Sequence, residues 1–435
     1  IITTGYYTFP TDYYFADLDG SWNADQDHIF GEAADGLEGY PEVYVSRIPV
    51  HTAEDVGHFI TRLLKYEKLE GVQDPDYFSR VLYLAANLKR DNDGRDLILN
   101  HIDPQINPEF DRVMITQNED VGSDPQVAIN ELNKNYGLIF SENHGAYHTI
   151  RPGAPGSNIY NYMIEDVANQ EPGIWYMASC ETNDIVKRAF SGAYMLAPNG
   201  GGVAYIGNSS WEYPFSGVYL QKEFFNLIFN RGHTNLGEAH FLSRYPYLGH
   251  IGGEGPARVI VFSTVVLGDP EMPVWTESPQ ELVISHPAQV RLGYNEISID
   301  VQAASGSPEE NVQVVLYQPD GIYLSAFSDA EGTASFEFSL AQLGEIHVTA
   351  LKHNFVPEES TIRIAHKSGP RLDLGDVSMT DISGNKNGFC EPGEEIELHM
   401  TFLNAGTVTL QEGLVIEVSA PDPGLRISNG RYVFA

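Results

Sequence analysis

Two short apolar segments, YGLIFSENHG (136–145) and GIWYMASC (173–180), decide the fold expected for this chain. Each contains a continuous apolar run, which is typical of a strand buried on both faces of a parallel sheet. The first run leads into His144, and the second ends on Cys180. Because neighbouring parallel strands bring their carboxyl ends to the same edge of a sheet, we expect this histidine and this cysteine to meet there.

A histidine and a cysteine side by side can form a catalytic pair. Imidazole can draw out the thiol proton, and the thiolate is the nucleophile. Gly145 has no side chain that would block a substrate carbonyl, and its N–H could join that of Cys180 in an oxyanion hole. Taken separately, a cysteine after an apolar strand is more often a small buried residue, and a His-Gly pair is commonly a turn. Their occurrence on successive strands favours the catalytic interpretation.

Helical and strand patterns alternate on both sides of these segments. Thr52 is a plausible N-cap for a helix over 53–68, and Ser123 with Gln126 has the spacing of a capping box. Strands are expected in four further stretches: EVYVSRIPV (42–50), VLYLAAN (81–87), GGVAYIGNSS (201–210) and ARVIVFSTVVLG (257–268). This alternation predicts an α/β domain with a mainly parallel sheet and helices on both faces.

The pattern changes to period-2 strands separated by turns after LGDPEMPVW (267–275). We therefore expect three domains: an α/β domain over 1–276, a β-sandwich over 277–366, and a second, truncated β-sandwich over 369–435. The opening IITTGYYTFP and the closing ISNGRYVFA resemble interior segments, so we also expect an amino-terminal portion of the same precursor to be missing.

Charge and hydropathy exclude several partner classes. The 60 acidic residues against 25 Lys and Arg give a formal charge of −35, which repels nucleic acid and anionic membranes. No apolar run is long enough to span a bilayer. Such a surface could attract basic substrates or divalent cations, or it could serve solubility alone.

The order of several motifs resembles that of gingipain-type cysteine peptidases. They are DYYFADLDG (12–20), YPEVYVSRIPV (40–50), the helix ending LLKYEK (63–68), the His-Gly strand, ASCET (178–182) and LGDPEMPVW (267–275). The resemblance implies a caspase-like α/β domain followed by immunoglobulin-like modules in a secreted or surface protein of a bacterium. It also implies His144 and Cys180 as the catalytic dyad, a thioester acyl-enzyme, and protein or peptide substrates.

The sequence departs from the family pattern at the third catalytic position. The family has an acidic residue after the preceding strand to orient the histidine, whereas here the strand end reads LAANLKRD and Asn87 falls near that place. An amide can still accept a hydrogen bond from imidazole. The family's carboxylate for a basic P1 side chain matches Asp96, with Asp93 next, and its flanking aromatic residue matches Trp211. These matches imply a preference for Arg or Lys at P1.

Two polar loops have the composition of calcium sites. Oxygen-bearing side chains at alternate positions are typical of calcium loops, and carboxylates crowded together repel one another unless a cation neutralises them. A solvated acidic loop is the alternative in each case. The candidate Ca²⁺ ligands are Asp17, Asp19, Asn23, Asp25, Asp27 and Glu32 in the first loop, and Ser383, Asn385, Asn387 and Glu394 in the second.

Two other functions are compatible with the same residues. A transpeptidase or transamidase could use the same Cys-His pair, because nothing in the sequence separates hydrolysis from aminolysis. A calcium-stabilised surface module without catalysis is the second alternative, and the intact His144-Gly145 and Cys180 argue against it.

Overall fold

The computed structural model of the protein describes residues 1–4, 7–365, 372–387, 389, 391–404, 414–420 and 424–434. Contacts divide the chain into two compact units. The first comprises residues 1–280 with 353–356, and the second comprises residues 281–352 with 357–435.

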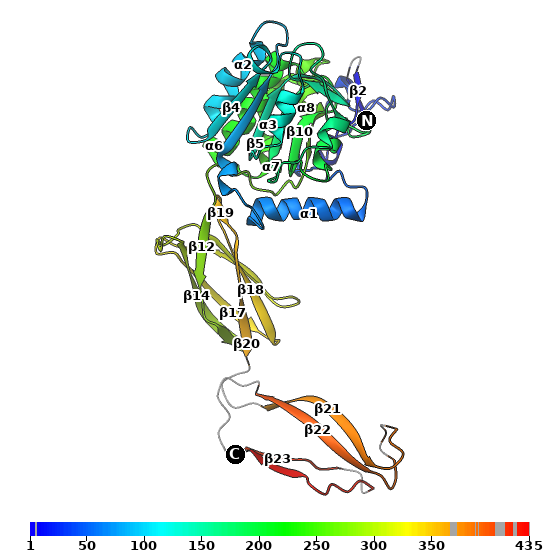
Figure 1. Ribbon diagram of the computed structural model, residues 1–435, viewed down its shortest axis with the longest axis vertical. Coiled ribbons are helices and arrows are strands. Elements are labelled where there is room, and N and C mark those ends of the chain that lie inside the picture. The colour runs from blue at the N-terminus through cyan, green and yellow to red at the C-terminus, as the bar shows by residue number, and fades with distance from the viewer. Residues whose placement is uncertain are drawn as a thin grey trace. The chain divides into compact units, whose positions relative to one another are not determined.

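A six-stranded sheet forms the centre of the first unit (Figure 1). Five strands pair in parallel, and the edge strand β11 is antiparallel to β10. The predicted mainly parallel sheet is therefore confirmed. Its order is β11 (Thr264–Leu267), β10 (Ala204–Asn208), β9 (Ile174–Ala178), β5 (Leu138–Glu142), β3 (Arg80–Ala85) and β4 (Asp111–Thr116).

Side chains of the central strands alternate between two hydrophobic cores. On β5, Leu138 and Phe140 belong to one core and Ile139 to the other. This period of two follows from strand geometry, and it lets both faces of the sheet be covered. The helices on one face of the sheet are α2 (Asp93–Leu97), α6 (Pro214–Arg231), α7 (Leu236–Leu242) and α8 (Pro256–Ser263). The helices that contribute to the core on the other face are α1 (Ala53–Lys68), α3 (Gln126–Leu132), α4 (Asn161–Ile164) and α5 (Phe190–Met195).

Two helix starts were predicted, and one of them is confirmed. Thr52 caps α1: its hydroxyl accepts from the Asp55 N–H at 3.1 Å, and the Asp55 carboxylate accepts from the Thr52 N–H at 2.8 Å. The predicted capping box at Ser123 is wrong, because α3 begins three residues later and the Asp124 carboxylate accepts from the Gln126 N–H instead.

Two predicted strands are also corrected. Residues 256–263 form α8, and only 264–267 form a strand. Residues 258–267 are buried without a break, so periodicity could not separate helix from strand, whereas Pro256 at the first turn favours the helix. Residues 42–50 make no regular strand and touch the sheet through a single bridge between Arg47 and Leu267.

Two small antiparallel assemblies extend the first unit. A hairpin pairs β1 (Ile2–Thr4) with β2 (Tyr7–Phe9). A three-stranded ribbon follows directly after β5 and consists of β6 (His144–Ala146), β7 (Thr149–Arg151) and β8 (Ile159–Tyr160). Residues 353–356, which include β19 (Phe355–Val356), also group with this unit.

The second unit is rich in β-structure. Buried and exposed residues alternate along its strands, as on β14, where Ile297, Ile299 and Val301 are buried. One sheet contains β17 (Thr333–Leu340), β14 (Gly293–Ala303) and β12 (Gln280–Ser285); the other contains β13 (Gln289–Arg291), β20 (Glu358–Ala365), β18 (Gly344–Leu351), β15 (Gln313–Tyr317) and β16 (Tyr323–Phe327).

The described residues after 371 form two antiparallel pairs. β21 (Leu372–Ser383) pairs with β22 (Glu395–Asn404), and β23 (Leu414–Glu417) pairs with β24 (Arg431–Phe434). Within the described ranges, every helix is too short or too polar to cross a lipid bilayer.

Candidate active site

The register between β5 and β9 sets the positions of the candidate dyad. Glu142 lies opposite Ala178 in the parallel ladder. His144 and Cys180 each follow two residues later, at the carboxyl edge of the sheet. Neighbouring strands lie about 4.8 Å apart, so equal offsets from a paired position place the two residues at neighbouring strand ends.

Gly145 packs directly against the cysteine turn. A Cβ at this position would lie 2.2 Å from Ser179 Oγ, 2.8 Å from Thr182 Cγ2 and 3.1 Å from the Cys180 carbonyl oxygen. The glycine is therefore needed for the close approach of the two strand ends. The sequence analysis explained Gly145 by the access that it leaves for a substrate carbonyl. The structure adds a second reason, which is the close packing against residues 179–182.

A tight turn holds the Cys180 thiol. Glu181 adopts a left-handed conformation with φ of 57°, and its N–H donates to the Ser210 carbonyl at 2.7 Å. Non-glycine residues in this region are uncommon and often mark functional turns. The half-buried Cys180 Sγ accepts from the Glu212 N–H at 3.4 Å. Cys390, the other cysteine, lies outside the described residues.

His144 is oriented by a backbone carbonyl. Its Nε2 lies 3.1 Å from the carbonyl oxygen of Asn87. Since a carbonyl only accepts, Nε2 carries the proton and Nδ1 is the basic nitrogen. This corrects the prediction for Asn87: its side-chain amide does not contact His144 but donates to Asn118 at 2.9 Å and accepts from the Asn92 N–H at 2.8 Å.

Asp93 holds the loop that presents this carbonyl. Its buried carboxylate accepts from the backbone N–H groups of Leu88, Lys89 and Arg90 at 2.7–2.8 Å. Burial alone would raise the pKa of Asp93, but these hydrogen bonds lower it. The Asp93 carboxylate is therefore occupied by backbone hydrogen bonds of its own loop, and it is unsuited to bind a substrate cation.

The two residues matched to the P1 pocket lie on exposed surface. Asp96 is exposed on α2, and its carboxylate has no partner within the described part of the chain. Trp211 is 50% exposed, and its ring centroid lies 5.8 Å from that of Tyr7. Trp211 therefore lies at the surface and not in the hydrophobic core.

Burial favours the neutral form of both members of the candidate dyad. It lowers the pKa of His144, and the charge of Arg151 lowers it further. Burial also raises the pKa of the Cys180 thiol, and the charges of Glu212, Glu181 and Glu142 act in the same direction. The arrangement therefore favours a neutral imidazole beside a neutral thiol over a preformed ion pair.

Two buried glutamates beneath this edge were missed by sequence reasoning. Burial raises the pKa of Glu212 to about 7 and that of Glu142 well above its usual range. Glu212 accepts from Asn208 and Gln221, whereas neither Glu142 oxygen has a partner among the described residues. A glutamate inside the apolar run LIFSEN was the available signal for Glu142.

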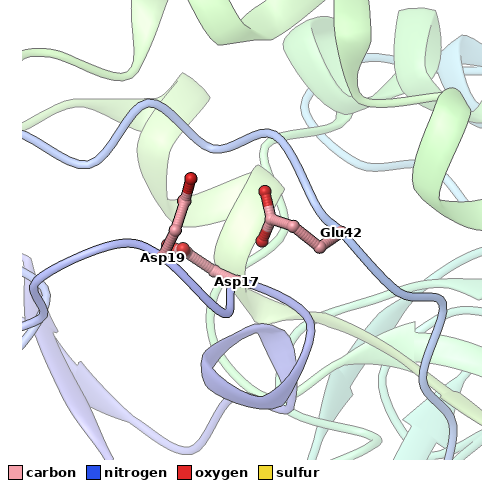
Figure 2. Close-up of side chains that lie close together, drawn as sticks. All are labelled: Asp17, Asp19 and Glu42. Carbon is pink, nitrogen blue, oxygen red and sulfur yellow. The ribbon is translucent and has the colours of Figure 1, made fainter.

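The first acidic loop forms two carboxylate groups. Figure 2 shows Asp17 and Asp19 facing Glu42, which comes from a separate segment. In each group, the carboxylate oxygens lie within 4.8 Å of one another; the second consists of Asp25, Asp27 and Glu32. Glu42 was missed because it lies far from the loop in sequence.

Several oxygens of this loop and of Glu42 already accept hydrogen bonds from the protein backbone. The Asn23 side chain accepts from the His28 N–H at 3.1 Å. The Leu18 N–H donates to Glu42 at 2.7 Å, and the Gly20 N–H donates to Asp17 at 2.7 Å. Burial raises the pKa of Asp17, with opposing hydrogen bonds. A hard cation such as Ca²⁺ fits these all-oxygen groups.

The second polar loop is closed by its own hydrogen bonds. Glu394 accepts from the Asn385 N–H at 3.0 Å, and the Asn385 side chain accepts from the Asn387 N–H at 2.9 Å. Glu391, which sequence reasoning missed, accepts from both asparagine side chains. Ser383 pairs with Glu395 in the β21–β22 ladder. Gly388, which follows Asn387 in this loop, lies outside the described residues.

Replacing Gly145 with Ala tests the close approach of the two strand ends. We expect a loss of about 1–3 kcal/mol in unfolding free energy, because overpacking forces neighbouring atoms to shift, together with altered alkylation of Cys180. Denaturant unfolding and iodoacetamide labelling measure the two effects. Gly192→Ala is the matched control, since its Cβ would meet nothing within 4 Å. Equal stability of the two variants would contradict the packing constraint.

Replacing Glu212 with Gln tests the electrostatics of the thiol. Ionised Glu212 raises the pKa of Cys180, so a neutral amide is expected to increase the thiolate fraction and the rate of iodoacetamide labelling. The increase in labelling rate should appear at pH values above about 7, where Glu212 is ionised. It should disappear at pH values well below 7, where Glu212 is protonated. Glu223→Gln on α6 controls for the loss of one charge. A pH-independent difference would contradict this account.

The chain matches a known protein family over most of its first unit. Residues 1–275 match the family described as peptidase family C25. Gingipain R1 from Porphyromonas gingivalis is 22% identical over 371 residues, which cover 81% of this chain and 36% of the relative. Gingipain R2 from the same species is 21% identical over 356 residues, 78% of this chain and 46% of the relative. The chain thus spans less than half the length of these curated relatives.

A solved structure shows the same fold. The crystal structure of the Arg-specific cysteine proteinase gingipain R (RgpB) has a TM-score of 0.62 with 17% sequence identity, over 82% of this chain and 79% of that one. A complex of the Porphyromonas gingivalis RgpB pro- and mature domains has a TM-score of 0.63 with 16% identity, over 82% and 81%. The predicted caspase-like fold is confirmed, and the match over residues 1–275 shows that the chain belongs to peptidase family C25, the family of gingipain-type cysteine peptidases.

Proposed function

We propose that this chain hydrolyses peptide bonds as a cysteine endopeptidase, with Cys180 as the nucleophile and His144 as general base and acid. The β5–β9 register supports the proposal, because it brings the two residues to neighbouring strand ends at the edge where open α/β sheets bind ligands. Family membership supports the same chemistry.

The reaction follows from the protonation states of the pair. Nδ1 of His144 takes the thiol proton as Sγ attacks the substrate carbonyl carbon, and the N–H groups of Cys180 and Gly145 stabilise the oxyanion. The imidazolium then protonates the leaving amine, the C–N bond breaks and a thioester forms. Water, deprotonated by His144, attacks the thioester, and the released thiol recovers its proton.

A basic P1 residue is the proposed specificity. Asp96 would contact the cation and Trp211 would cover its aliphatic stem. Support comes from the Asp96 carboxylate, which forms no ion pair with the adjacent Arg95 or with any other described residue. The acidic surface of the chain would also attract basic substrates.

The proposal also covers the cellular location of the protein, its processing from a precursor and its binding of structural calcium. Resemblance to the gingipain-type family supports an extracellular or cell-surface protein of a bacterium with a preceding pro-segment, since a complex of pro- and mature domains is among the similar structures. Structural Ca²⁺ would be held by Asp17, Asp19 and Glu42 and by Asp25, Asp27 and Glu32.

Two substitutions test the dyad. Cys180→Ala is expected to abolish peptide hydrolysis, because it removes the nucleophile. His144→Ala should slow both hydrolysis and labelling of Cys180 by iodoacetamide, since it removes the base. A fluorogenic peptide assay and mass-spectrometric labelling measure these rates. Hydrolysis that survives Cys180→Ala in pure protein would overturn the proposal.

A positional peptide library tests the specificity. We expect cleavage after Arg or Lys, and Asp96→Asn should reduce that preference without abolishing turnover, since an unpaired cation is costly to desolvate. Asp166→Asn, an exposed carboxylate outside the proposed site, is the control. Cleavage after Leu, Phe or Asp with no preference for Arg or Lys would discard the basic P1 pocket and leave the dyad intact.

Chelation tests the calcium proposal. Removing Ca²⁺ should lower the melting temperature, because a ligand at a hundred times its Kd stabilises the native state by about 2.7 kcal/mol. Asp25→Ala or Asp27→Ala should weaken this effect, and Asp166→Asn should leave it unchanged. An unaltered melting temperature in chelator, with no metal found by elemental analysis, would mean that the loops are simply acidic.

A further inference from the structure

Arg151 lies beside the candidate histidine on the ribbon that follows β5. In the antiparallel pairing of β6 with β7, Arg151 is directly opposite His144. Side chains of directly opposed residues project to the same face, with Cβ atoms about 4.5–5.5 Å apart. The charge of Arg151 also lowers the pKa of His144. Register and electrostatics therefore agree that the guanidinium is within reach of the imidazole.

The Arg151 cation has no acidic partner. Its Nε is buried without a hydrogen-bond acceptor, and no described carboxylate forms an ion pair with it. Most other arginines of this unit bind carboxylates or backbone carbonyls, as Arg112 binds Asp103 at 2.6 Å and Arg244 binds the Val261 carbonyl at 2.9 Å. Among the exceptions, the Arg90 guanidinium lies over the Phe215 ring. An unpaired arginine in a chain with 60 acidic and 25 basic residues leaves a cation free for a ligand.

The position of Arg151 indicates which half of a substrate it faces. In a Cys-His peptidase, the histidine donates its proton to the leaving amine, so the residues after the cleaved bond pass on the histidine side. The β6–β7 ribbon continues directly from β5 on that side. Arg151, directly opposite the histidine, is therefore expected to face the leaving half of the peptide.

We propose that Arg151 forms a subsite for a carboxylate on the leaving-group side of the scissile bond. The subsite favours Asp or Glu within the first two residues after the cleaved bond, and it rests on the proposed peptidase function. A guanidinium offers a planar fork of donors that matches a carboxylate in a bidentate geometry. A free chain-end carboxylate shares this chemistry and is the other possible source of the anion.

Matched peptides test the subsite in the wild-type protein. Internally quenched peptides with the preferred P1 residue carry Glu or the isosteric Gln at the first or second position after the cleaved bond. We expect kcat/KM to be about tenfold higher for Glu at one of these positions, since charge-assisted hydrogen bonds are about twice as strong as neutral ones. A third pair, with Gln at both positions and a free or amidated carboxyl end after the second residue, shows whether a chain end can occupy the same subsite.

Substitutions connect the preference to Arg151. Arg151→Gln should remove the difference between Glu and Gln peptides, and Arg151→Lys should retain part of it. Arg231→Gln, which removes a surface arginine paired with Glu223, should leave the full difference. Arg151→Gln should also move the acidic limb of the pH profile upward, because it removes a charge that lowers the pKa of His144. If Arg151 acted only through His144, both peptides of a pair would be affected equally.

The outcomes separate the subsite from the proposed function. Equal kcat/KM for every carboxylate-bearing peptide and its neutral partner in the wild type would overturn the subsite alone, whether or not the variants fold. A preference that persists in Arg151→Gln would overturn the role of Arg151. No cleavage of any peptide would overturn the peptidase function and the subsite together.

Discussion

The parallel pairing of β5 with β9 is the constraint on which the rest of the site depends. Its register leaves His144 and Cys180 at equal distances beyond the paired residues Glu142 and Ala178. A slip of one residue would turn every side chain of a strand to the opposite face of the sheet, so both hydrophobic cores hold this register. The bare Cα of Gly145 then allows the two strand ends to approach each other.

Loops from neighbouring strands refine the position that the sheet sets. The Asn87 carbonyl orients His144 from the end of β3, and the buried Asp93 fixes that loop through backbone N–H groups. The turn after β10 brings the Glu212 N–H to the thiol. Asn87 and Glu212 contact the candidate dyad through backbone atoms, so their own side chains can vary while these contacts are kept. The side chain of Asp93 cannot, because its carboxylate holds the loop.

Burial explains the electrostatic character of the site. Removing charged groups from water favours their neutral forms, and here it acts on thiol, imidazole and two glutamates together. For the proposed dyad, this favours proton transfer during nucleophilic attack over an ion pair formed beforehand. Arg151 is the exception: it carries an uncompensated charge beside neutral groups, where a substrate carboxylate would supply the missing partner.

The sequence by itself determined the strands that carry the dyad. Continuous apolar runs ending in His144 and Cys180 are sufficient to predict parallel strands and a shared edge, because hydrophobic periodicity and sheet topology are local or nearly local properties. The helix capped by Thr52 and the β-rich second unit follow from equally local signals. Only the tertiary structure decided that the backbone carbonyl of Asn87 orients the histidine. The same is true of Asp93, whose carboxylate accepts hydrogen bonds from its own loop, and of Glu42, which lies beside Asp17 and Asp19. Those contacts depend on the direction in which loops fold back, which is set by packing between segments far apart in the chain.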